Sequence, residues 1–235
     1  MSEQRGKIDN LYYHQHENDE YEYILSQIKN PELNSSEQTT LVKIISKNYF
    51  DSFEETLAPI LLNIIRAGCP LYTKIEIQNV LSNGKKFTAD LLIENLGSIG
   101  ENQHLKLPSK TSGKKTYPIA RDICARILQK MDEIAVYEIC TNIQNNKLDN
   151  SQISESLDVL GYCIFHNSLL GNEDVLKTIV NQTRSEDSVC KWKAIRALSS
   201  FKDNDFVENY LTDLLDKENS DIINSEIERS LKFIR

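Results

Sequence analysis

The sequence has little of what β-sheet proteins and membrane proteins need. It holds 8 glycines and 5 prolines in 235 residues, too few for the many turns of an all-β sandwich or barrel. It has no run of about 18 apolar residues, so we expect no membrane-spanning helix. The first 23 residues are polar and acidic, which fits neither a secretory signal nor a transit peptide. We therefore expect a cytoplasmic protein without membrane contact.

The cysteines follow no metal-binding or disulfide pattern. Five are present, an odd number, and no two have the Cys-x-x-Cys spacing. We expect reduced, buried thiols that pack as small apolar side chains, and we expect neither a metal nor a cofactor. The five positions are Cys69, Cys124, Cys140, Cys163 and Cys190.

Two further groups of residues are weaker candidates for chemistry. His14 and His16 lie in a polar N-terminal tail and would need additional ligands to hold a metal. Cys163 and His166 are three residues apart on one helix face and could form a thiol–imidazole pair. Packing of the thiol and a helix-end position of the histidine explain this second pair without catalysis.

What the sequence does contain is typical of a globular helical protein. Apolar residues make up 40% and charged residues 26%, which is enough for a core and unlike a disordered chain. Apolar residues recur at three- and four-residue spacing along nearly the whole chain, which predicts about twelve helices of about 10–16 residues. Polar or acidic residues that favour helix starts lie at Ser36, Asp51, Asp187 and Ser220.

One local pattern recurs along the chain: a small residue, an apolar one, any residue and two apolar ones. Its copies are 37, 33 and 36 residues apart, and each falls in the second helix of a predicted helix pair. The small residue would let that helix pack closely against its neighbour. The copies begin at Cys124, Gly161, Ala194 and Ser230, with a weaker one, Ile77–Leu81, 47 residues before the first.

The period and the pattern resemble HEAT repeats, the helical-hairpin family of α-solenoids. The best match is the stretch 187–198, with an acidic residue in the turn and an apolar–basic pair before the small positions. The stretch 118–128 is similar, with Arg121 at the position of Lys191. Pro59 falls within a first helix, where the family often has a kinking proline. The fourth pair departs from the pattern, because Asp158 replaces the basic residue.

The resemblance implies an all-α protein, a right-handed superhelix of about six antiparallel hairpins in an armadillo-type array. Such hairpins bury their apolar faces against neighbouring hairpins and leave an extended concave surface. We expect a polar tail over residues 1–16 and a single α-solenoid domain over 17–235.

A basic loop interrupts the repeat. We define the basic loop as residues 98–116; it is rich in Gly, Ser, Thr and Pro and has no helical pattern. From Glu101 to Lys130, seven basic residues face two acidic ones, whereas both ends of the chain are acidic. We expect the basic loop to project from the array and to carry the positive end of a charge-segregated surface.

Six residues are candidates for contact with a partner. They are Lys106, Lys110, Lys114, Lys115, Arg121 and Trp192. The lysines suit an acidic protein surface or a phosphate, or they belong to a solvated insertion without a ligand. Arg121 and Lys191 either contact a ligand or pair with turn carboxylates such as Glu186 and Asp187. Trp192 is either a core residue of its repeat or an exposed anchor.

These observations favour a noncatalytic module that binds a protein partner on its concave face. No nucleophile, base and oxyanion donor are brought together by any motif. A regulatory or immunity-type protein that occludes a partner fits, because the net charge of −8 suits a basic toxin or nuclease.

Two other functions stay open as alternatives. Some alkylpurine DNA glycosylases are built from HEAT-like hairpins and use tryptophan and a carboxylate near the lesion. This chain has one tryptophan and a net charge of −8, which repels polyanions and makes nucleic acid a poor partner. The third function is that of a solenoid lyase or chaperone that handles a cofactor or a client.

Overall fold

The computed structural model describes residues 5–30 and 32–234, and these residues form α-helices without any strand. Residues 1–4 of the expected tail lie outside the described residues. The chain divides into two compact units, residues 1–91 and 92–235, where we expected one domain over 17–235. The division falls within α5 (Lys86–Glu94). A long stretch without α-helix, residues 95–122, follows α5 within the second unit.

The first unit is built around one long helix. This helix, α3, packs against the three shorter helices of the unit, which surround it. Non-helical backbone angles at Phe53 (φ −128°, ψ 29°) kink α3, close to the helix start expected at Asp51 and six residues before Pro59. The four helices are α1 (Asn10–His16), α2 (Tyr21–Ile28), α3 (Ser35–Ala67) and α4 (Leu71–Leu81).

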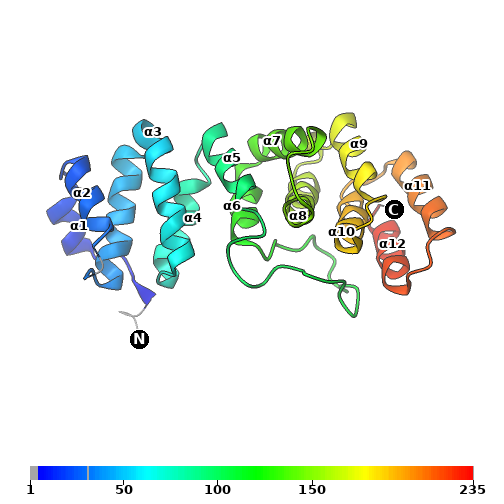
Figure 1. Cartoon of the computed structure of the whole chain (residues 1–235), viewed down its shortest axis with the longest axis horizontal. Coiled ribbons are helices and arrows are strands. Elements are labelled where there is room, and N and C mark those ends of the chain that lie inside the picture. Colours follow the sequence, from blue (N-terminus) through cyan, green and yellow to red (C-terminus); the bar gives the residue numbers. More distant parts are fainter. Residues whose placement is uncertain (1–4, 31, 235) are drawn as a thin grey trace. The chain divides into compact units, whose positions relative to one another are not determined.

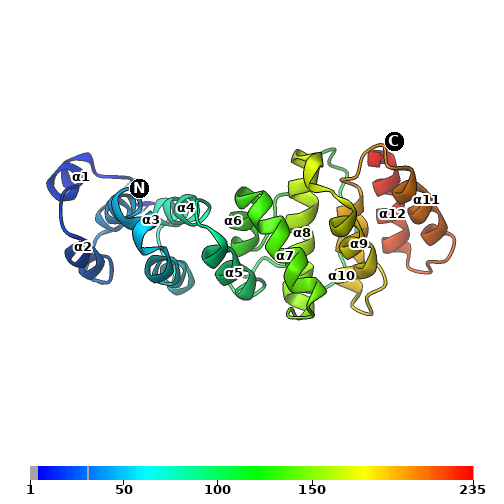
Figure 2. The same cartoon turned by 90° about the horizontal axis from the view of Figure 1, so that it is seen from above.

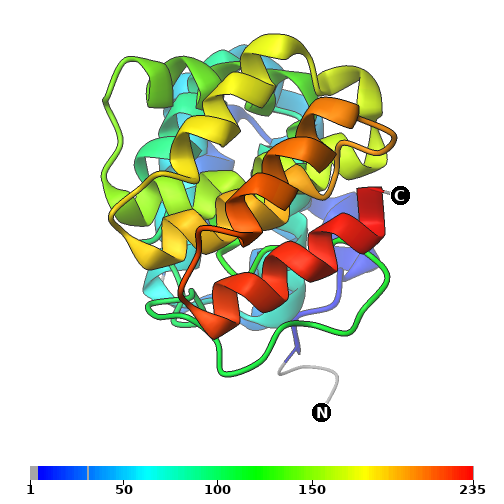
Figure 3. The same ribbon diagram turned by 90° about the vertical axis from the view of Figure 1, so that its right-hand side faces the viewer.

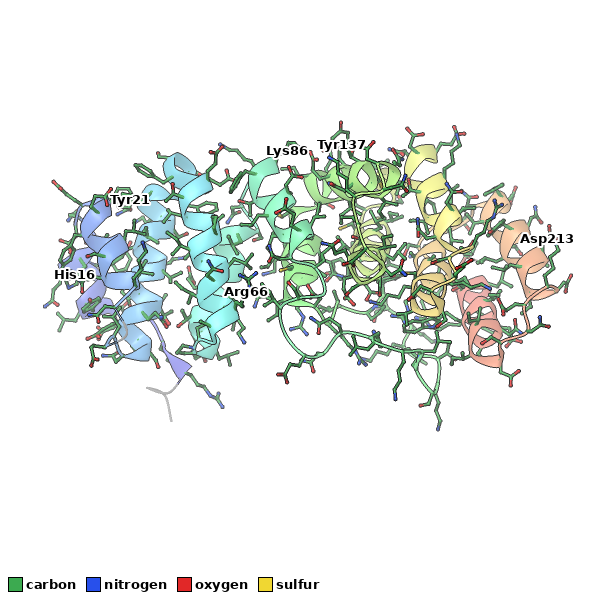
Figure 4. The ribbon with its side chains drawn as sticks, viewed as in Figure 1. His16, Tyr21, Arg66, Lys86, Tyr137 and Asp213 are labelled. Carbon is green, nitrogen blue, oxygen red and sulfur yellow. The ribbon has the colours of Figure 1, made fainter. Side chains whose placement is uncertain are left out.

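Residues 10–16 are not a loose tail, as we expected, but a helix docked on α3. Asp9 caps α1 by accepting hydrogen bonds from the backbone N–H groups of Leu11 and Tyr12. The backbone N–H of Asp9 donates to Thr40 Oγ1 on α3 at 2.9 Å. Figure 4 labels His16 and Tyr21 on the first two helices. A short polar segment is thus ordered by a helix cap and by tertiary contacts with α3 that its own sequence does not predict.

The second unit contains the remaining helices. After α5, its helices follow one another from α6 to α12, as Figures 1 and 2 show. They are α6 (Ile123–Met131), α7 (Glu133–Gln144), α8 (Asn150–His166), α9 (Glu173–Gln182), α10 (Ser188–Leu198), α11 (Asp205–Leu215) and α12 (Asp221–Ile234), with a 3₁₀ turn, η2, at Ser168–Leu170. Several helices are shorter than the 10 residues expected, since turns and caps occupy their ends.

Polar residues at the helix starts explain where these helices begin. Asp122, Asp149 and Asp187 each precede a helix and accept hydrogen bonds from its first free backbone N–H groups. Asp149 forms a reciprocal capping box with Gln152. Because these groups would otherwise lack partners inside the helix, the caps fix the boundaries of α6, α8 and α10.

The even-numbered helices of the second unit pack in succession, α6 on α8, α8 on α10 and α10 on α12. The four small residues that begin the repeated pattern lie on these four helices, and all are buried. Ser230 Oγ donates to the Ile195 carbonyl of the neighbouring helix at 3.2 Å. The structure therefore places Cys124, Gly161, Ala194 and Ser230 at closely packed positions of successive helices, as the pattern predicted.

Enlarging one of these residues tests the packing. Ala194→Leu should lower the free energy of unfolding of the second unit by about 1–3 kcal/mol, because the side chain is fully buried and has no room to expand. Urea unfolding followed by the fluorescence of Trp192, the single tryptophan, measures this change. Thr212→Leu is the control, since Thr212 is exposed on α11. Equal stability of the two variants would contradict the packing.

Candidate functional site

The basic loop lies along the second unit and does not project from it. From the end of α5 it passes beneath α8 and α10 towards α12 and returns to the start of α6, as Figures 1 and 3 show. At its base, the buried carboxylate of Asp122 accepts hydrogen bonds from Gly97 N (3.2 Å) and Gln103 Nε2 (2.9 Å). The expectation of a projecting loop is wrong, because α12 binds the backbone of the loop.

Arg229 on α12 holds the middle of the basic loop. Its Nε donates to the carbonyl of Ser112 at 2.8 Å, and its Nη2 donates to the carbonyl of Lys114 at 3.3 Å. The same guanidinium donates through Nη1 to Glu226 Oε1 at 2.9 Å. The loop is thus fixed through its backbone, and the lysine side chains take no part in these bonds.

Tyr117, the residue after the basic loop, packs against a glycine of α8. Its ring is buried, and a Cβ atom built on Gly161 would come within 2.0 Å of its hydroxyl oxygen. Only a residue without a side chain leaves room for the tyrosine at this point. The small residue at position 161 therefore admits the end of the loop as well as a neighbouring helix.

A chain of buried charges links three helices beneath the loop. Lys193 on α10 pairs with Glu155 (2.7 Å) and Asp158 (2.9 Å) of α8. Arg196, one turn further along α10, lies 3.6 Å from Asp158 and 3.8 Å from Glu226 of α12. With the Glu226–Arg229 pair, three cations face three carboxylates. We call these six residues the buried ionic network.

The charges of this network shift one another's protonation. Burial alone would raise the pKa of Asp158, but Lys193 and Arg196 outweigh it and hold that pKa below its usual value. Burial would lower the pKa of Lys193, yet the two carboxylates raise it instead. Burial raises the pKa of Glu155. The Lys193–Asp158 pair is therefore ionised at neutral pH.

Trp192 lies in the interior, with 1% of its surface exposed, and is not an exposed anchor. Its indole Nε1 donates to Glu226 Oε2 at 2.9 Å. The guanidinium of Arg196 covers its ring at 3.7 Å, and the ring of His104 from the loop meets it edge-on at 5.0 Å. Of the two interpretations of Trp192, the core position is the one that this geometry matches.

A cavity of about 490 Å³ lies between the loop and helices α8 and α10. Its helix wall includes Asp158, Trp192 and Arg196. Its loop wall carries basic, polar and apolar residues, which are Lys110, Ser112, Lys114, Thr116, Tyr117, Pro118, Ile119 and Arg121, with His104 and Pro108. The loop thus closes a space that the helices alone would leave open.

A second hollow, a cleft of about 750 Å³, lies on the other side of the loop segment 111–115. Phe165 of α8 and Phe233 of α12 contribute aromatic faces, over which Lys202 and Arg229 lie at 4.6 and 4.5 Å. Together the two hollows are lined by eight basic and two acidic residues. This face is cationic in a chain of net charge −8.

The structure brings five of the six predicted partner-contact residues to one region. Lys110, Lys114, Lys115 and Arg121 are exposed and line one or both hollows, and Trp192 lies beneath them. Lys106 is exposed on the same loop but lines neither hollow. The missed residues are Asp158, Arg196 and Arg229. The departure from the repeat pattern at Asp158 was the one sequence signal that could have found them.

The two basic residues matched by the repeat pattern differ in the structure. Lys191, in the first turn of α10, pairs with Glu218, a carboxylate of the turn before α12. This is the structural role expected for it, although the partner is neither Glu186 nor Asp187. Arg121 precedes the cap of α6 and lies outside the helix, so its position is not equivalent to that of Lys191.

The histidines and cysteines that were candidates for chemistry have structural roles instead. His14 and His16 pair with Glu17 and Asp19 at 3.1 and 2.5 Å. Cys163 donates to the carbonyl of Gln129 (3.9 Å), and burial raises its thiol pKa to about 12. All five cysteines are free thiols and four are buried, whereas Cys69 is half-buried.

No group of three or more His, Cys, Asp or Glu side chains within residues 5–30 and 32–234 is placed to hold a metal ion. Over the same residues, no helix has both the length and the apolar character of a bilayer span. No protein-family model matches the chain, and no curated protein matches it.

The contact between Gly161 and Tyr117 can be broken by one methyl group. Gly161→Ala should displace the tyrosine ring and loosen the basic loop, so trypsin should cleave at Lys110, Lys114 and Lys115 several-fold faster. Gly113→Ala is the matched control, because no atom lies within 4 Å of a Cβ built on that loop residue. If both variants are cleaved at the wild-type rate, Tyr117 does not anchor the loop.

Removing the central cation tests the buried ionic network. Lys193→Met should destabilise the second unit by about 3–5 kcal/mol at pH 7, because Glu155 loses its partner and Asp158 keeps only Arg196. The loss should shrink towards pH 4. The carboxylates would then titrate at raised pKa values in the folded state, so their protonated forms are favoured there.

Lys191→Met is the matched control for this variant. Lys191 lies on the same helix but pairs with Glu218, and both side chains are half-buried and still reached by solvent, so its loss should cost about 1 kcal/mol or less. Urea unfolding of both variants at several pH values separates a fully buried pair from a solvent-accessible one. Equal losses in the two variants would contradict the role given to Lys193.

Proposed function

We propose that this chain is a noncatalytic interaction module that binds an acidic protein partner through the cationic face of its second unit. The observation that carries the proposal is the way the basic loop is fixed. Arg229 holds its backbone and Asp122 holds the side chain of Gln103, and Lys110, Lys114 and Lys115 are exposed on the loop fixed in this way. A pre-ordered cationic surface loses little entropy when it binds, which favours recognition.

Exposed apolar residues beside the lysines support a protein as the partner. Leu105 is 88% exposed and Ile119 is 66% exposed, and both lie on or next to the basic loop. Protein interfaces combine apolar anchors with a charged rim, whereas binding to a phosphate backbone is dominated by the basic residues alone. The mixture of lysines and large apolar side chains therefore favours a protein surface with acidic residues around an apolar centre.

We also propose that the packing of the helices is that of a HEAT-like α-solenoid of the armadillo type, a right-handed superhelix of about six hairpins. The succession of α6, α8, α10 and α12, with a small buried residue on each, supports this class for the second unit. In the first unit, α3 joins two expected helices into one kinked helix, which departs from a regular hairpin. A regulatory protein fits such a module; an immunity-type protein would have to occlude an acidic partner through this face, and not the basic toxin or nuclease that the net charge alone suggests.

A second function has one observation in its favour. Trp192, Asp158 and Arg196 line the same cavity, and HEAT-like alkylpurine DNA glycosylases use a tryptophan and a carboxylate. Release of an alkylated purine from duplex DNA, lost in Asp158→Asn, would support this alternative. The buried ring of Trp192 and the pairing of Asp158 with Lys193 favour the noncatalytic function instead.

Neutralising the loop tests the proposed partner surface. Changing Lys106, Lys110, Lys114 and Lys115 to Ser should weaken partner binding by about tenfold or more at low salt, mainly by slowing association. The difference should shrink as salt rises, because charges are screened over about 8–10 Å. Capture from the native host, followed by affinity measurement with the purified partner, provides both values.

Two further variants separate charge from apolar contact. The quadruple change of Lys29, Lys147, Lys177 and Lys217 to Ser alters the net charge equally but leaves the loop intact, so binding should stay close to wild type. The double change of Leu105 and Ile119 to Ser should weaken binding at all salt concentrations. Partner affinity that is unchanged in both loop variants at low salt would reject the proposed surface.

A further inference from the structure

The cavity beneath the basic loop has the size of a small-molecule site. Its volume of about 490 Å³ lies within the range typical of such sites, about 300–1,000 Å³. Pro108, Tyr117 and Pro118 give it apolar surfaces on the loop side, and Asp158 and Arg196 give it polar ones on the helix side. All of these residues belong to the second unit.

The charges around this cavity favour an anion. Lys110, Lys114 and Arg121 are exposed at its loop side, and the guanidinium of Arg196 is buried in its wall. Among the residues that line it, Asp158 carries the one carboxylate, and this carboxylate is already paired with Lys193 at 2.9 Å and with Arg196 at 3.6 Å. The three cations at the loop side are therefore available to a ligand.

The protonation of His104 reports the same positive field. The pKa of its imidazole is lowered to about 4, mainly by burial, and the lowering by Lys193 and Arg121 outweighs the opposing effect of Asp158. At neutral pH the ring is uncharged, so it adds no charge of its own to the wall. A bound anion would stabilise the imidazolium and raise this pKa.

Unpaired polar atoms indicate that the ligand is more than a bare anion. Asp158 Oδ1, the Tyr117 hydroxyl and His104 Nδ1 are buried and have no hydrogen-bond partner among the described residues. Asp158 and Tyr117 are 3% and 4% exposed. A carboxylate oxygen only accepts hydrogen bonds when ionised, so its partner must carry a donor, whereas the cations require an acceptor-rich group.

We propose that this cavity binds a phosphate monoester carried on a ring with hydroxyl or amino groups, the chemistry that nucleoside monophosphates and sugar phosphates share. The phosphate would lie among Lys110, Lys114 and Arg121, where its two negative charges meet three cations. The ring would pack against the apolar loop wall, with one of its donors directed at Asp158. This inference does not depend on the protein partner, because it concerns the isolated chain.

Calorimetry on the full-length chain tests the site directly. The probes are AMP, glucose 6-phosphate, adenosine, glucose and inorganic phosphate, at one salt concentration and pH 7. At least one ester should bind about tenfold or more tightly than both its unphosphorylated counterpart and inorganic phosphate. Comparison of the two esters tells the nucleoside source from the sugar source. Failure of both esters to bind at millimolar concentration overturns the proposal, as does equally tight binding of inorganic phosphate.

Matched variants locate the binding. The triple change of Lys110, Lys114 and Arg121 to Ser should weaken ester binding by about tenfold or more. The control changes Lys106, Lys115 and Lys147 to Ser, which removes the same charge from exposed positions that do not line the cavity. Equal affinity of the two triple variants would place any bound ester elsewhere and overturn the assignment.

An NMR titration of His104 measures the pKa of its imidazole with and without the ester. A substitution that only disturbs the structure would not produce a ligand-dependent change in this pKa. Saturation with the ester should raise the pKa of His104 above its value of about 4, because a bound anion favours the imidazolium. The triple variant should show no such ligand-dependent rise. Ester binding that leaves the His104 titration unchanged would contradict a site beneath the basic loop.

Discussion

The buried ionic network is the interaction on which the second unit depends. Its six charged side chains connect α8, α10 and α12, and its last member, Arg229, also holds the basic loop. Removing charges from water costs several kcal/mol per ion, so each charge needs partners in place. Three cations and three carboxylates satisfy that condition together only when the helices lie in one register. The network therefore specifies an arrangement that apolar packing alone would leave less well defined.

The position of the basic loop follows from this network. Arg229 donates through Nη1 to Glu226, and its Nε and Nη2 donate to the carbonyls of Ser112 and Lys114. A backbone carbonyl accepts a hydrogen bond whatever side chain its residue carries. The lysine side chains of the loop are therefore free to face solvent. One buried cation thereby determines where a set of exposed cations lies. The cavity beneath the loop is a consequence of the same contact, because the loop forms one of its walls.

The sequence predicted the parts of this structure that depend on local pattern. Helix class, the start of α10 at Asp187 and the burial of Ala194 all follow from spacing and capping residues. The docking of the loop could not be predicted, because Arg229 is 117 residues from the Ser112 carbonyl that it binds. Every residue has a backbone carbonyl, so the sequence does not indicate which one accepts this bond. The kinked α3 and the docked α1 likewise depend on tertiary contacts. Asp158 did leave a trace, as an acidic residue where the repeat pattern expects a basic one.

The network also explains why the polar cavity and the stable interior can exist side by side. Asp158 binds Lys193 with Oδ2, which leaves Oδ1 with only the longer approach of Arg196 at 3.6 Å. The ion pair at Oδ2 holds the carboxylate of Asp158 in place, and Oδ1 can still accept a hydrogen bond from a ligand. The same holds for Arg196, which covers Trp192 and lies between two carboxylates at distances too long for good hydrogen bonds. The ion pairs therefore hold the cavity wall in position, while Asp158 Oδ1 still lacks a hydrogen-bond partner. A selective polar site requires both a fixed geometry and groups that can bind the ligand.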